Sequence, residues 1–492
     1  PLQHPLQRHY PEATKGHGRL NLVGRDVMQL GDILDDLTLD VQTGRIEISH
    51  VDLDSRDCVP GSLFFAMPGA STHGADFASD AVLRGAVCII ASEPVAVPVP
   101  VVMVPPSLLL ALCAHASAAV TEHPESKARL VAVTGTNGKT SVTSILSALA
   151  HAVGWNGGSI GTLTNQRTTP ASPELFRSLA SLVDQFDTNV SDSLVAMEVS
   201  SHALDQRRVD GLLFAVATFT NLSHEHLDYH STMEEYFSVK SHLFTSEHAR
   251  RAVVWTDDPY GERVREMTTL PLTSVSRNDA SDVETSLEGS TFFWRGHLIN
   301  SALVGDYNVD NTLIAMTVMS VLGADDAVIA AAMGDVPAIP GRFDVIRGSK
   351  VTVIVDYAHT PEGLRRLLSD VRALAPSSRM LVVFGCGGDR DRTKRPEMGE
   401  VVSALADVTI VTSDNPRSES PDSIIDAVLS GVTASAEVER IVDRRAAIAR
   451  ALVLALPGDV VVIAGKGHET TQTIGSDALP FDDRVVAREL LQ

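Results

Sequence analysis

A short β-branched run, Leu130–Thr134, leads directly into a glycine-rich turn that ends in Gly138-Lys139-Thr140, and a helical pattern follows. Strand, glycine turn and helix in this order are typical of a phosphate-binding loop, where backbone N–H groups and the helix N-terminus carry partial positive charge. Lys139 adds a full charge, and Thr140 offers a hydroxyl group to Mg²⁺. The spacing Gly-x-x-Gly-Lys-Thr is shorter than the general pattern, but the flanking strand and helix disfavour an ordinary glycine turn. We therefore expect an α/β chain that binds ATP or GTP.

The net charge limits the partners of the chain. Its 492 residues include 62 acidic and 40 basic ones, which gives a formal net charge of −22. Nucleic acids and anionic membranes are bound by basic surfaces, so we expect neither nucleic-acid binding nor stable membrane insertion. An anionic substrate would instead need a local basic pocket. The four separated cysteines have no CxxC spacing and favour reduced, buried thiols in a cytosolic protein (Cys58, Cys88, Cys113 and Cys386).

The length of the chain exceeds what one hydrophobic core usually supports, and two proline-containing joints divide it. The joints are Glu122–Lys127 and Ile339–Arg342. We expect a leader and N-terminal α/β domain at 1–127, a central domain at 128–340 and a C-terminal domain at 341–492. Pro1–Gly18 has no apolar segment, so we expect no targeting signal and a cytoplasmic location.

Hydrophobic patterns predict the elements of these domains. The apolar stretch Val82–Val120 could suggest a membrane segment, but charges and prolines interrupt it. It favours two buried strands, at 86–90 and 101–104, and a helix at 108–120. Strand-like runs alternate with helical ones through the rest of the chain, which predicts a doubly wound parallel sheet in the central domain and a Rossmann-like sheet in the C-terminal domain. The expected strands are 130–134, 194–199 and 214–220 in the former and 351–356, 380–384, 408–412 and 460–464 in the latter.

Polar side chains gather where two of the central strands end. Glu198 terminates one strand, where a carboxylate can reach the Mg²⁺ expected near Thr140. His224, His226 and His230 follow the next strand and could suggest zinc. No cysteine lies near them, and a nucleotide with Mg²⁺ already explains an oxygen-rich pocket, so magnesium is the favoured metal.

Six motifs in order along the chain together resemble the Mur ligases. They are Thr134-Gly-Thr-Asn-Gly-Lys-Thr140, Glu198-Val-Ser-Ser-His202, Asn221-Leu followed by His226-Leu-Asp-Tyr-His230, Gly305-Asp-Tyr-Asn-Val-Asp-Asn311, Pro340-Gly-Arg342 and Asp356-Tyr-Ala-His-Thr-Pro361. The resemblance extends from Asp54-Ser-Arg56 to Gly465-Lys-Gly-His-Glu469 and so covers nearly the whole chain. Within the family, the pattern is most similar to the branch that adds the third residue of the peptidoglycan stem peptide.

The resemblance implies a mechanism and an ATP site. ATP phosphorylates the terminal carboxylate of the substrate, and the incoming amine attacks the acyl phosphate. Lys139, Glu198, His226 and Lys240 are the implied catalytic residues; Thr140, Glu198, His226 and a carbamylated Lys240 are the implied Mg²⁺ ligands. Without the resemblance, Lys240 would be taken for an exposed helix lysine. The implied ATP-binding residues are Gly135, Thr136, Asn137, Gly138, Lys139, Thr140, Ser141, Asn221, Asn308, Asn311, Arg342 and Asp356.

The resemblance also implies the other substrates and their sites. UDP-N-acetylmuramoyl-L-Ala-D-Glu would contact Ser55, Thr168, Thr169, Ser172, Ser200, Gln206 and Arg208. The amino acid to be added would be meso-diaminopimelate, held by Arg390, Asp414, Asn415, Arg417, Gly465 and Glu469. Its distal carboxylate, which L-lysine lacks, calls for a guanidinium group, and Arg417 fits that role. The chain departs from the family pattern at Arg207, where histidine is expected, and at Asp344, where glutamate is common.

Other interpretations remain open at this stage. An L-lysine-adding ligase would share nearly all of these motifs. A folylpolyglutamate synthetase-like ligase would share the ATP machinery but would not need Thr168-Thr-Pro170 or Asp414-Asn-Pro-Arg417. A non-catalytic nucleotide-binding protein would be free to lose the four implied catalytic residues, and all four are present. A monomer is expected.

Overall fold

The computed structural model describes residues 27–35, 37–69, 72–165, 167–225, 229–434 and 436–492. The leader expected at Pro1–Gly18 lies outside these ranges. The chain divides into two compact units, one up to Leu112 and one from Cys113 to Gln492. Within the described ranges, no helix combines the length and the apolar character needed to cross a bilayer.

The first unit contains a four-stranded parallel sheet in the order β3-β4-β5-β6 and an antiparallel pair, β1 and β2. β4 is buried along its whole length and packs with β5 in the core of this unit. The two strands expected at 86–90 and 101–104 are confirmed as β5 and β6, and the expected helix as α4, whose residues run from the first unit into the second at Cys113. The bounds are β1 Met28–Gln29, β2 Glu47–Ile48, β3 His50–Asp52, β4 Ser62–Ala66, β5 Ala86–Ala91, β6 Val101–Met103, α1 Leu30–Ile33, α2 Val41–Gly44, α3 Ala78–Arg84 and α4 Pro106–Val120.

The second unit begins with the predicted doubly wound sheet, whose six strands are all parallel in the order β12-β11-β10-β7-β9-β8. The three expected strands are confirmed as β7, β9 and β10. Helices cover both faces of such a sheet, which is why its central strands are continuously apolar. The bounds are β7 Arg129–Thr134, β8 Asn156–Ile160, β9 Ser193–Glu198, β10 Val216–Phe219, β11 Ala252–Trp255, β12 Leu272–Val275, α5 Lys139–Ala152, α6 Ser172–Val183, α7 Ser201–Asp205, α8 Met233–Ser241, α9 Pro259–Met267, α10 Asp306–Val321 and α11 Asp326–Ala332.

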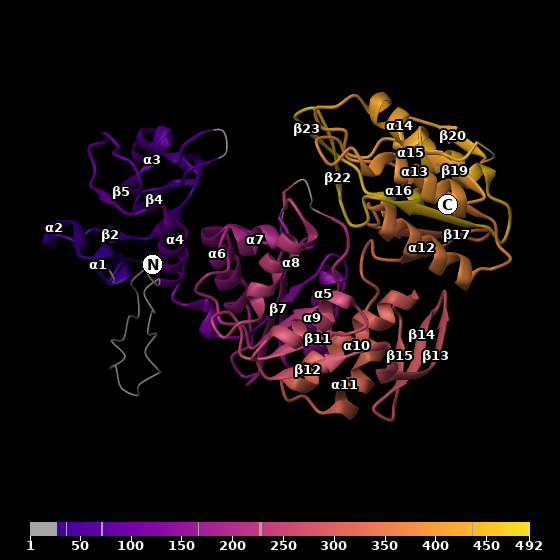
Figure 1. Cartoon of the computed structure of the whole chain (residues 1–492), viewed down its shortest axis with the longest axis horizontal. Coiled ribbons are helices and arrows are strands. Elements are labelled where there is room, and N and C mark those ends of the chain that lie inside the picture. The colour runs from indigo at the N-terminus through magenta and orange to yellow at the C-terminus, as the bar shows by residue number, and fades with distance from the viewer. Residues whose placement is uncertain (1–26, 36, 70–71, 166, 226–228, 435) are drawn as a thin grey trace. The chain divides into compact units, whose positions relative to one another are not determined.

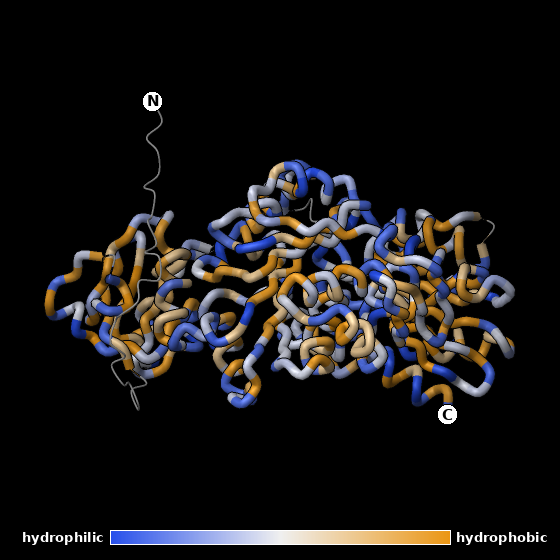
Figure 2. Tube along the Cα trace, turned by 90° about the horizontal axis from the view of Figure 1, so that it is seen from below, coloured by the Kyte–Doolittle hydropathy of each residue, from blue (hydrophilic) through white to orange (hydrophobic). Residues whose placement is uncertain are grey.

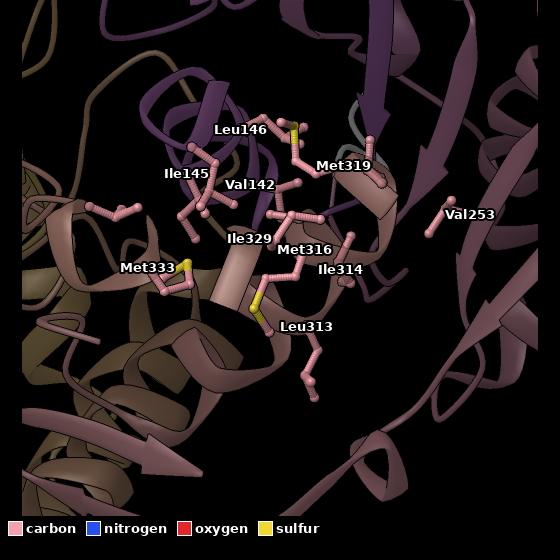
Figure 3. Close-up of a cluster of buried hydrophobic side chains, with 14 of the residues drawn as sticks. Val142, Ile145, Leu146, Val253, Leu313, Ile314, Met316, Met319, Ile329 and Met333 are labelled. Atoms are coloured by element: carbon pink, nitrogen blue, oxygen red, sulfur yellow. The ribbon is translucent and has the colours of Figure 1, made fainter. Parts of the chain in front are cut away.

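The apolar faces of α5 and α10 form the core on one side of this sheet. Figure 3 shows side chains of α5, among them Val142 and Leu146, gathered with Leu313 and Met316 of α10. All four are fully buried. Because α5 starts at the phosphate-binding loop and α10 carries Asn308 and Asn311, this packing fixes two of the expected ATP-binding segments against each other.

A three-stranded antiparallel sheet that the sequence patterns did not predict precedes α10 (Figure 1). Its strands are β13 Ala280–Ser286, β14 Gly289–Trp294 and β15 His297–Ser301. On β14, Phe292 and Trp294 are buried while Phe293 between them is exposed. This alternation attaches one face of the small sheet to the core below α10.

The C-terminal part of the second unit contains the predicted Rossmann-like sheet, in the order β16-β17-β21-β18-β19-β20. The four expected strands are confirmed as the parallel strands β17, β18, β19 and β21, and β16 adds an antiparallel edge. β18 and β21 are buried along their whole length, and Figure 2 shows apolar and hydrophilic stretches alternating along the chain. The bounds are β16 Asp344–Arg347, β17 Thr352–Asp356, β18 Met380–Phe384, β19 Val408–Val411, β20 Val438–Arg440, β21 Val460–Ala464, β22 Thr471–Ile474, β23 Asp477–Pro480, α12 Pro361–Leu374, α13 Lys394–Leu405, α14 Pro421–Leu429, α15 Arg444–Leu454 and α16 Asp483–Leu490.

Candidate active site

The phosphate-binding loop lies between β7 and α5, as the sequence predicted. Gly135 has a φ of +152°, and a Cβ atom there would lie 1.9 Å from Thr220 Oγ1. Gly138, with a φ of +85°, directly precedes the first residue of α5. The loop can therefore hold only glycine at its first position, and the N-terminus of α5 faces the space above the sheet, where an anion is favoured.

Asn221 braces this loop from the end of β10. Its Oδ1 accepts the backbone N–H of Asn137 at 2.9 Å, and its Nδ2 donates to the carbonyl oxygen of Asn137 at 3.1 Å. The backbone carbonyl of Asn221 accepts the N–H of Thr136 at 2.8 Å. These three bonds fix the backbone on which phosphate recognition depends.

Glu198 lies at the end of β9 and is 1% exposed. Its Oε2 accepts the hydroxyl of Thr140 at 3.1 Å, while Oε1 accepts both the N–H and the hydroxyl of Thr162, at 2.8 and 3.0 Å. The expected meeting of Glu198 and Thr140 is thus present in the geometry. Carboxylate and hydroxyl oxygens beside a phosphate-binding loop are the donor set that Mg²⁺ prefers, so these residues fit the ion. His226 lies outside the described residues.

Two lysines approach the same carbonyl oxygen. Lys139 Nζ and Lys240 Nζ both donate to the oxygen of Gly135, at 2.9 and 3.1 Å. Lys240 is 1% exposed and also donates to Thr134 Oγ1 at 3.3 Å. Burial, followed by the positive charge of Lys139, holds the pKa of Lys240 well below its usual range. Burial also lowers the pKa of Lys139, although Glu225 and Glu198 oppose this change. Lys240 is therefore a buried amine and not an exposed helix lysine.

Residues beyond Pro340 complete the site opposite the loop. Arg342 Nη2 donates to Thr140 Oγ1 at 3.0 Å, its guanidinium group lies 4.2 Å from the centre of the Tyr357 ring, and its buried Nε has no hydrogen-bond partner among the described residues. Asp356 accepts the N–H of Phe343 at 2.8 Å and the hydroxyl of Tyr307 at 3.2 Å. Burial raises the pKa of Asp356, and Arg342 opposes that shift.

Most of these groups line one cavity of about 410 Å³, a size typical of small-ligand sites, but Lys240 is not among the lining residues. Among the expected ATP-binding residues, Gly135 and Asn308 do not line it. Asn308 is buried and binds Val304 O at 2.7 Å, and its Oδ1 accepts Asn311 Nδ2 at 3.1 Å, so it orients Asn311. The expected residues on the wall are Thr136, Asn137, Gly138, Lys139, Thr140, Ser141, Asn221, Asn311, Arg342 and Asp356, together with Thr168 and Glu198.

Five of the residues expected to bind the UDP-sugar dipeptide form one network beside Glu198. Thr169 Oγ1 donates to the carbonyl oxygen of Glu198 at 2.8 Å and accepts the N–H of Ser200 at 3.1 Å. Arg208 donates to Thr169 O and to Gln206 Oε1, each at 2.6 Å. Ser172 Oγ binds the carbonyl oxygen of Arg208 at 3.2 Å. Ser55 lies in the first unit, where it is buried in the 3₁₀ turn Ser55–Asp57.

Four of the residues expected to bind the amino acid also cluster together. Asn415 Nδ2 donates to Glu469 Oε2 at 2.8 Å, and Asp414 is buried beside Gly465, where a Cβ atom would lie 2.8 Å from Asp414 Oδ2. Lys466 was not predicted. It is 0% exposed and donates to Glu469 Oε2 at 3.0 Å.

Arg417 and Arg390 both approach the loop that follows β18. Arg417 Nη1 donates to the carbonyl oxygen of Gly388 at 2.6 Å. A Cβ atom on Gly387 would lie 3.0 Å from Arg417 Nη1 and 3.8 Å from Arg390 Cγ. The backbone of Arg417 pairs with β22, since its N–H donates to Thr473 O at 3.1 Å and its carbonyl accepts Gly475 N at 2.8 Å. The guanidinium group of Arg417 and the aliphatic part of the Arg390 side chain thus both lie beside Gly387.

Comparison with known proteins identifies the family. Three family models match in order: Mur ligase family, catalytic domain, at residues 47–137; Mur ligase middle domain, at 133–319; and Mur ligase, glutamate ligase domain, at 341–467. A relative from Geobacillus kaustophilus, named UDP-N-acetylmuramoyl-L-alanyl-D-glutamate--2,6-diaminopimelate ligase, is 43% identical over 475 residues, which cover 90% of this chain and 95% of the relative. The chain belongs to the Mur ligase family.

Solved structures agree with this Mur ligase assignment. A structure titled as a UDP-N-acetylmuramoyl-L-alanyl-D-glutamate--2,6-diaminopimelate ligase matches with a TM-score of 0.65 and 30% identity, covering 94% of this chain and 99% of that one. A folylpolyglutamate synthase from Mycobacterium tuberculosis matches with a TM-score of 0.56 and 18% identity, covering 72% and 91% of the two chains. The latter likeness shows the fold alone.

Sequence reasoning missed two residues that this Mur ligase builds into its site. Thr162 binds Glu198 from the turn after β8, and the strand itself was not predicted because its run Asn156-Gly-Gly is not strand-like. Lys466 lies within the motif Gly465-Lys-Gly-His-Glu469. Its position between Gly465 and Glu469, both expected to bind the amino acid, is the one feature of the sequence that could have indicated a role in that site.

Proposed function

We propose that this chain is an ATP-dependent amide-bond ligase that adds meso-diaminopimelate to UDP-N-acetylmuramoyl-L-alanyl-D-glutamate in peptidoglycan synthesis. The observation that carries the proposal is the cavity where the phosphate-binding loop, Glu198 and Arg342 meet. The identity of the substrates is supported by the names of relatives that are about 40% identical over nearly the whole chain. We keep 1–127, 128–340 and 341–492 as the proposed domains.

The first step joins two anions, and the cavity supplies the charge that this requires. A carboxylate oxygen of the nucleotide dipeptide attacks the γ-phosphorus of ATP, ADP leaves, and an acyl phosphate forms. Lys139 and the N-terminus of α5 neutralise the phosphate oxygens, and Arg342 offers its unpaired Nε to the same group. Mg²⁺, held by Thr140, Glu198, His226 and carbamylated Lys240, would supply further charge neutralisation.

In the second step, the amine of diaminopimelate attacks the acyl carbon, phosphate leaves and the amine loses a proton. Asp414, Asn415 and Glu469 form the proposed acceptor site. The carboxylate of Asp414 is suited to an ammonium group because its Oδ1 is buried without a hydrogen-bond donor among the described residues. Arg417 and Arg390 are the proposed partners of the distal carboxylate.

The proposal also includes the cellular compartment and the oligomeric state of the enzyme. All four cysteines are buried and none of them forms a disulfide bond, which supports a reducing compartment, and we propose a cytoplasmic monomer.

Phosphate release with purified UDP-N-acetylmuramoyl-L-Ala-D-Glu tests the proposal. Diaminopimelate, L-lysine and no amino acid are compared in parallel, and the product mass is measured. We expect ATP- and Mg²⁺-dependent release with diaminopimelate and a product heavier by one diaminopimelyl residue. Lys139→Ala should be inactive because no other residue in the loop supplies its charge. Phosphate release without a new amide product would contradict the proposal. A preference for L-lysine would show that L-lysine, and not diaminopimelate, is the amino acid that the enzyme adds.

A further inference from the structure

Lys466 is a buried cation in the middle of the proposed acceptor site. Its side chain is 0% exposed, and its Nζ donates to the carbonyl oxygen of Thr471 at 2.6 Å and to Glu469 Oε2 at 3.0 Å. Asn415 Oδ1 lies 3.4 Å from the same nitrogen, and Asp414 Oδ1 lies 3.8 Å from it. One ammonium group therefore contacts three segments: the loop after β19, its own loop and the start of β22.

These contacts determine which atoms stay available to a ligand. Asn415 is held at both ends of its amide, because Oδ1 also accepts the N–H of Thr473 at 2.9 Å and Nδ2 donates to Glu469. Asp414 Oδ1 has no hydrogen-bond donor among the described residues. A long lysine side chain loses its conformational freedom here, and burying its charge is costly unless it is paired. Such a residue is suited to ordering other groups.

The charges near Lys466 leave a negative excess. Arg444 and Asp483, both fully buried, pair with each other at 2.8 Å and cancel. Two carboxylates, Asp414 and Glu469, then face the single ammonium of Lys466. Burial raises the pKa of Asp414, and Arg444 and Lys466 oppose that shift. When both carboxylates are ionised the site retains one negative charge, which complements an ammonium group of an entering amino acid.

We propose that Lys466 is a positioning residue for the acceptor: it orders Asn415, Glu469 and the β22–β23 hairpin so that the remaining carboxylate charge binds an ammonium group of the amino acid. This inference rests on the proposed function and deepens it. Lys466 does not touch the nucleotide cavity, so its effect is confined to the second step of the reaction. Losing it should weaken acceptor binding while acyl phosphate formation continues.

The test separates the two steps in the full-length enzyme with Lys466→Met. Hydroxylamine traps the acyl phosphate as a hydroxamate when no amino acid is present, so it reports the first step alone. We expect the hydroxamate rate to stay within about 2-fold of wild type, because P-loop groups are unchanged. The kcat/KM for diaminopimelate should fall about 100-fold, mainly through KM, as expected when a reacting group loses its orientation. Lys350→Met, at an exposed lysine of the same sheet region, is the matched control.

The KM for diaminopimelate and the hydroxamate rate together decide whether Lys466 positions the acceptor. A raised KM with normal hydroxamate formation supports the positioning role. An unchanged KM overturns it, and so does a joint loss of both steps with loss of the thermal transition, which would make Lys466 a folding residue. Lys466→Gln, which still offers an N–H to Glu469, is a second variant in which the KM for diaminopimelate and the hydroxamate rate are measured and judged in the same way. If wild type itself forms neither hydroxamate nor amide, the proposed function fails instead.

Discussion

At the scale of single residues, the shared oxygen of Gly135 brings the amines of Lys139 and Lys240 together. Burial, followed by the positive charge of Lys139, lowers the pKa of Lys240 well below its usual range, which favours its neutral form. A neutral amine is the form that reacts with CO₂. The geometry thus suits the carbamate that the resemblance to the family implies for Lys240.

Lys240→Ala should therefore be nearly inactive. The loss of a carbamate that holds charge at the transferred phosphoryl group should lower kcat by at least about 100-fold. A small carboxylate added to the assay should restore part of the activity, because it can occupy the vacated space. Lys350→Ala, an exposed lysine, should behave as wild type. Full activity of Lys240→Ala would show that the amine is only a structural donor to Thr134.

Arg417→Ala tests acceptor specificity. If the guanidinium pairs with the distal carboxylate of meso-diaminopimelate, removal leaves that charge unpaired, at a cost of about 2–5 kcal/mol or tens- to thousands-fold in kcat/KM. Use of L-lysine should fall much less, and Arg417→Lys should not restore the preference, since an ammonium lacks two parallel donors. The backbone φ of +50° is equally unfavourable for all three side chains, so strain does not confound the comparison. A variant that keeps its diaminopimelate preference would refute the role.

The residues that could be predicted are those whose position follows from strand ends. Glu198 and Thr140 meet because parallel strands end at one edge of the sheet. Thr162 and Lys466 could not be inferred in this way. Their roles depend on how a turn and a buried loop are packed in three dimensions, and neither residue type signals that by itself.

At the scale of elements, buried parallel strands were predictable and short or amphipathic ones were not. β18 and β21 match the expected ranges residue for residue, because runs of Val, Ile and Leu allow few other structures. β13 is mostly polar, β14 and β15 have only two or three consecutive apolar residues each, and β8 begins with Asn-Gly-Gly. Such strands exist because of their tertiary partners and not because of local preference.

Helix α10 shows such tertiary support at its start. Its N-cap is Gly305, which has no side chain to accept the first N–H groups. Asp370 on α12 replaces the missing cap, because its Oδ2 accepts the N–H of Asp306 at 3.1 Å. Burial raises the pKa of Asp370 to about 6, and Arg366 opposes the shift. A carboxylate from the Rossmann-like sheet region thus caps the helix that carries Asn311.

Asp370→Asn should change how stability depends on pH. The folded protein binds this proton more tightly than the unfolded chain, whose carboxyl titrates near 4, so the contribution of Asp370 to stability falls as pH rises through about 4 to 6. Asparagine keeps an acceptor for Asp306 but does not titrate. The free energy of unfolding of wild type minus that of Asp370→Asn should therefore decrease between pH 4 and 7, measured by urea denaturation.

The control for this measurement is Glu266→Gln, which removes an exposed carboxylate from α9. Its difference from wild type should stay flat over the same pH range. A flat profile for Asp370→Asn as well would show that the cap carboxylate is already ionised at no cost.

At the scale of the whole molecule, a chain with a net charge of −22 must bind anionic substrates. The cations expected at its substrate sites are few, and each is fixed at a strand end or beside a loop, as with Lys139, Arg208 and Arg342. The nucleotide cavity is lined by the phosphate-binding loop and also by residues from the end of β17 to the first turn of α12, among them Asp356, His359 and Gly363. Nucleotide binding should therefore join two segments that are more than 200 residues apart in the sequence.

Hydrogen exchange with ADP and Mg²⁺ tests this coupling. At 100 times its Kd a ligand stabilises the state that binds it by about 2.7 kcal/mol, which slows exchange wherever opening would release the ligand. We expect slower exchange both in residues 134–141 and in 341–360, and no change in residues 37–69, whose unit has its own core. Arg342→Ala should keep the protection of 134–141 but lose that of 341–360, because the side chain that contacts Thr140 is gone. Protection limited to the phosphate-binding loop in wild type would contradict a nucleotide shared between the two sheets.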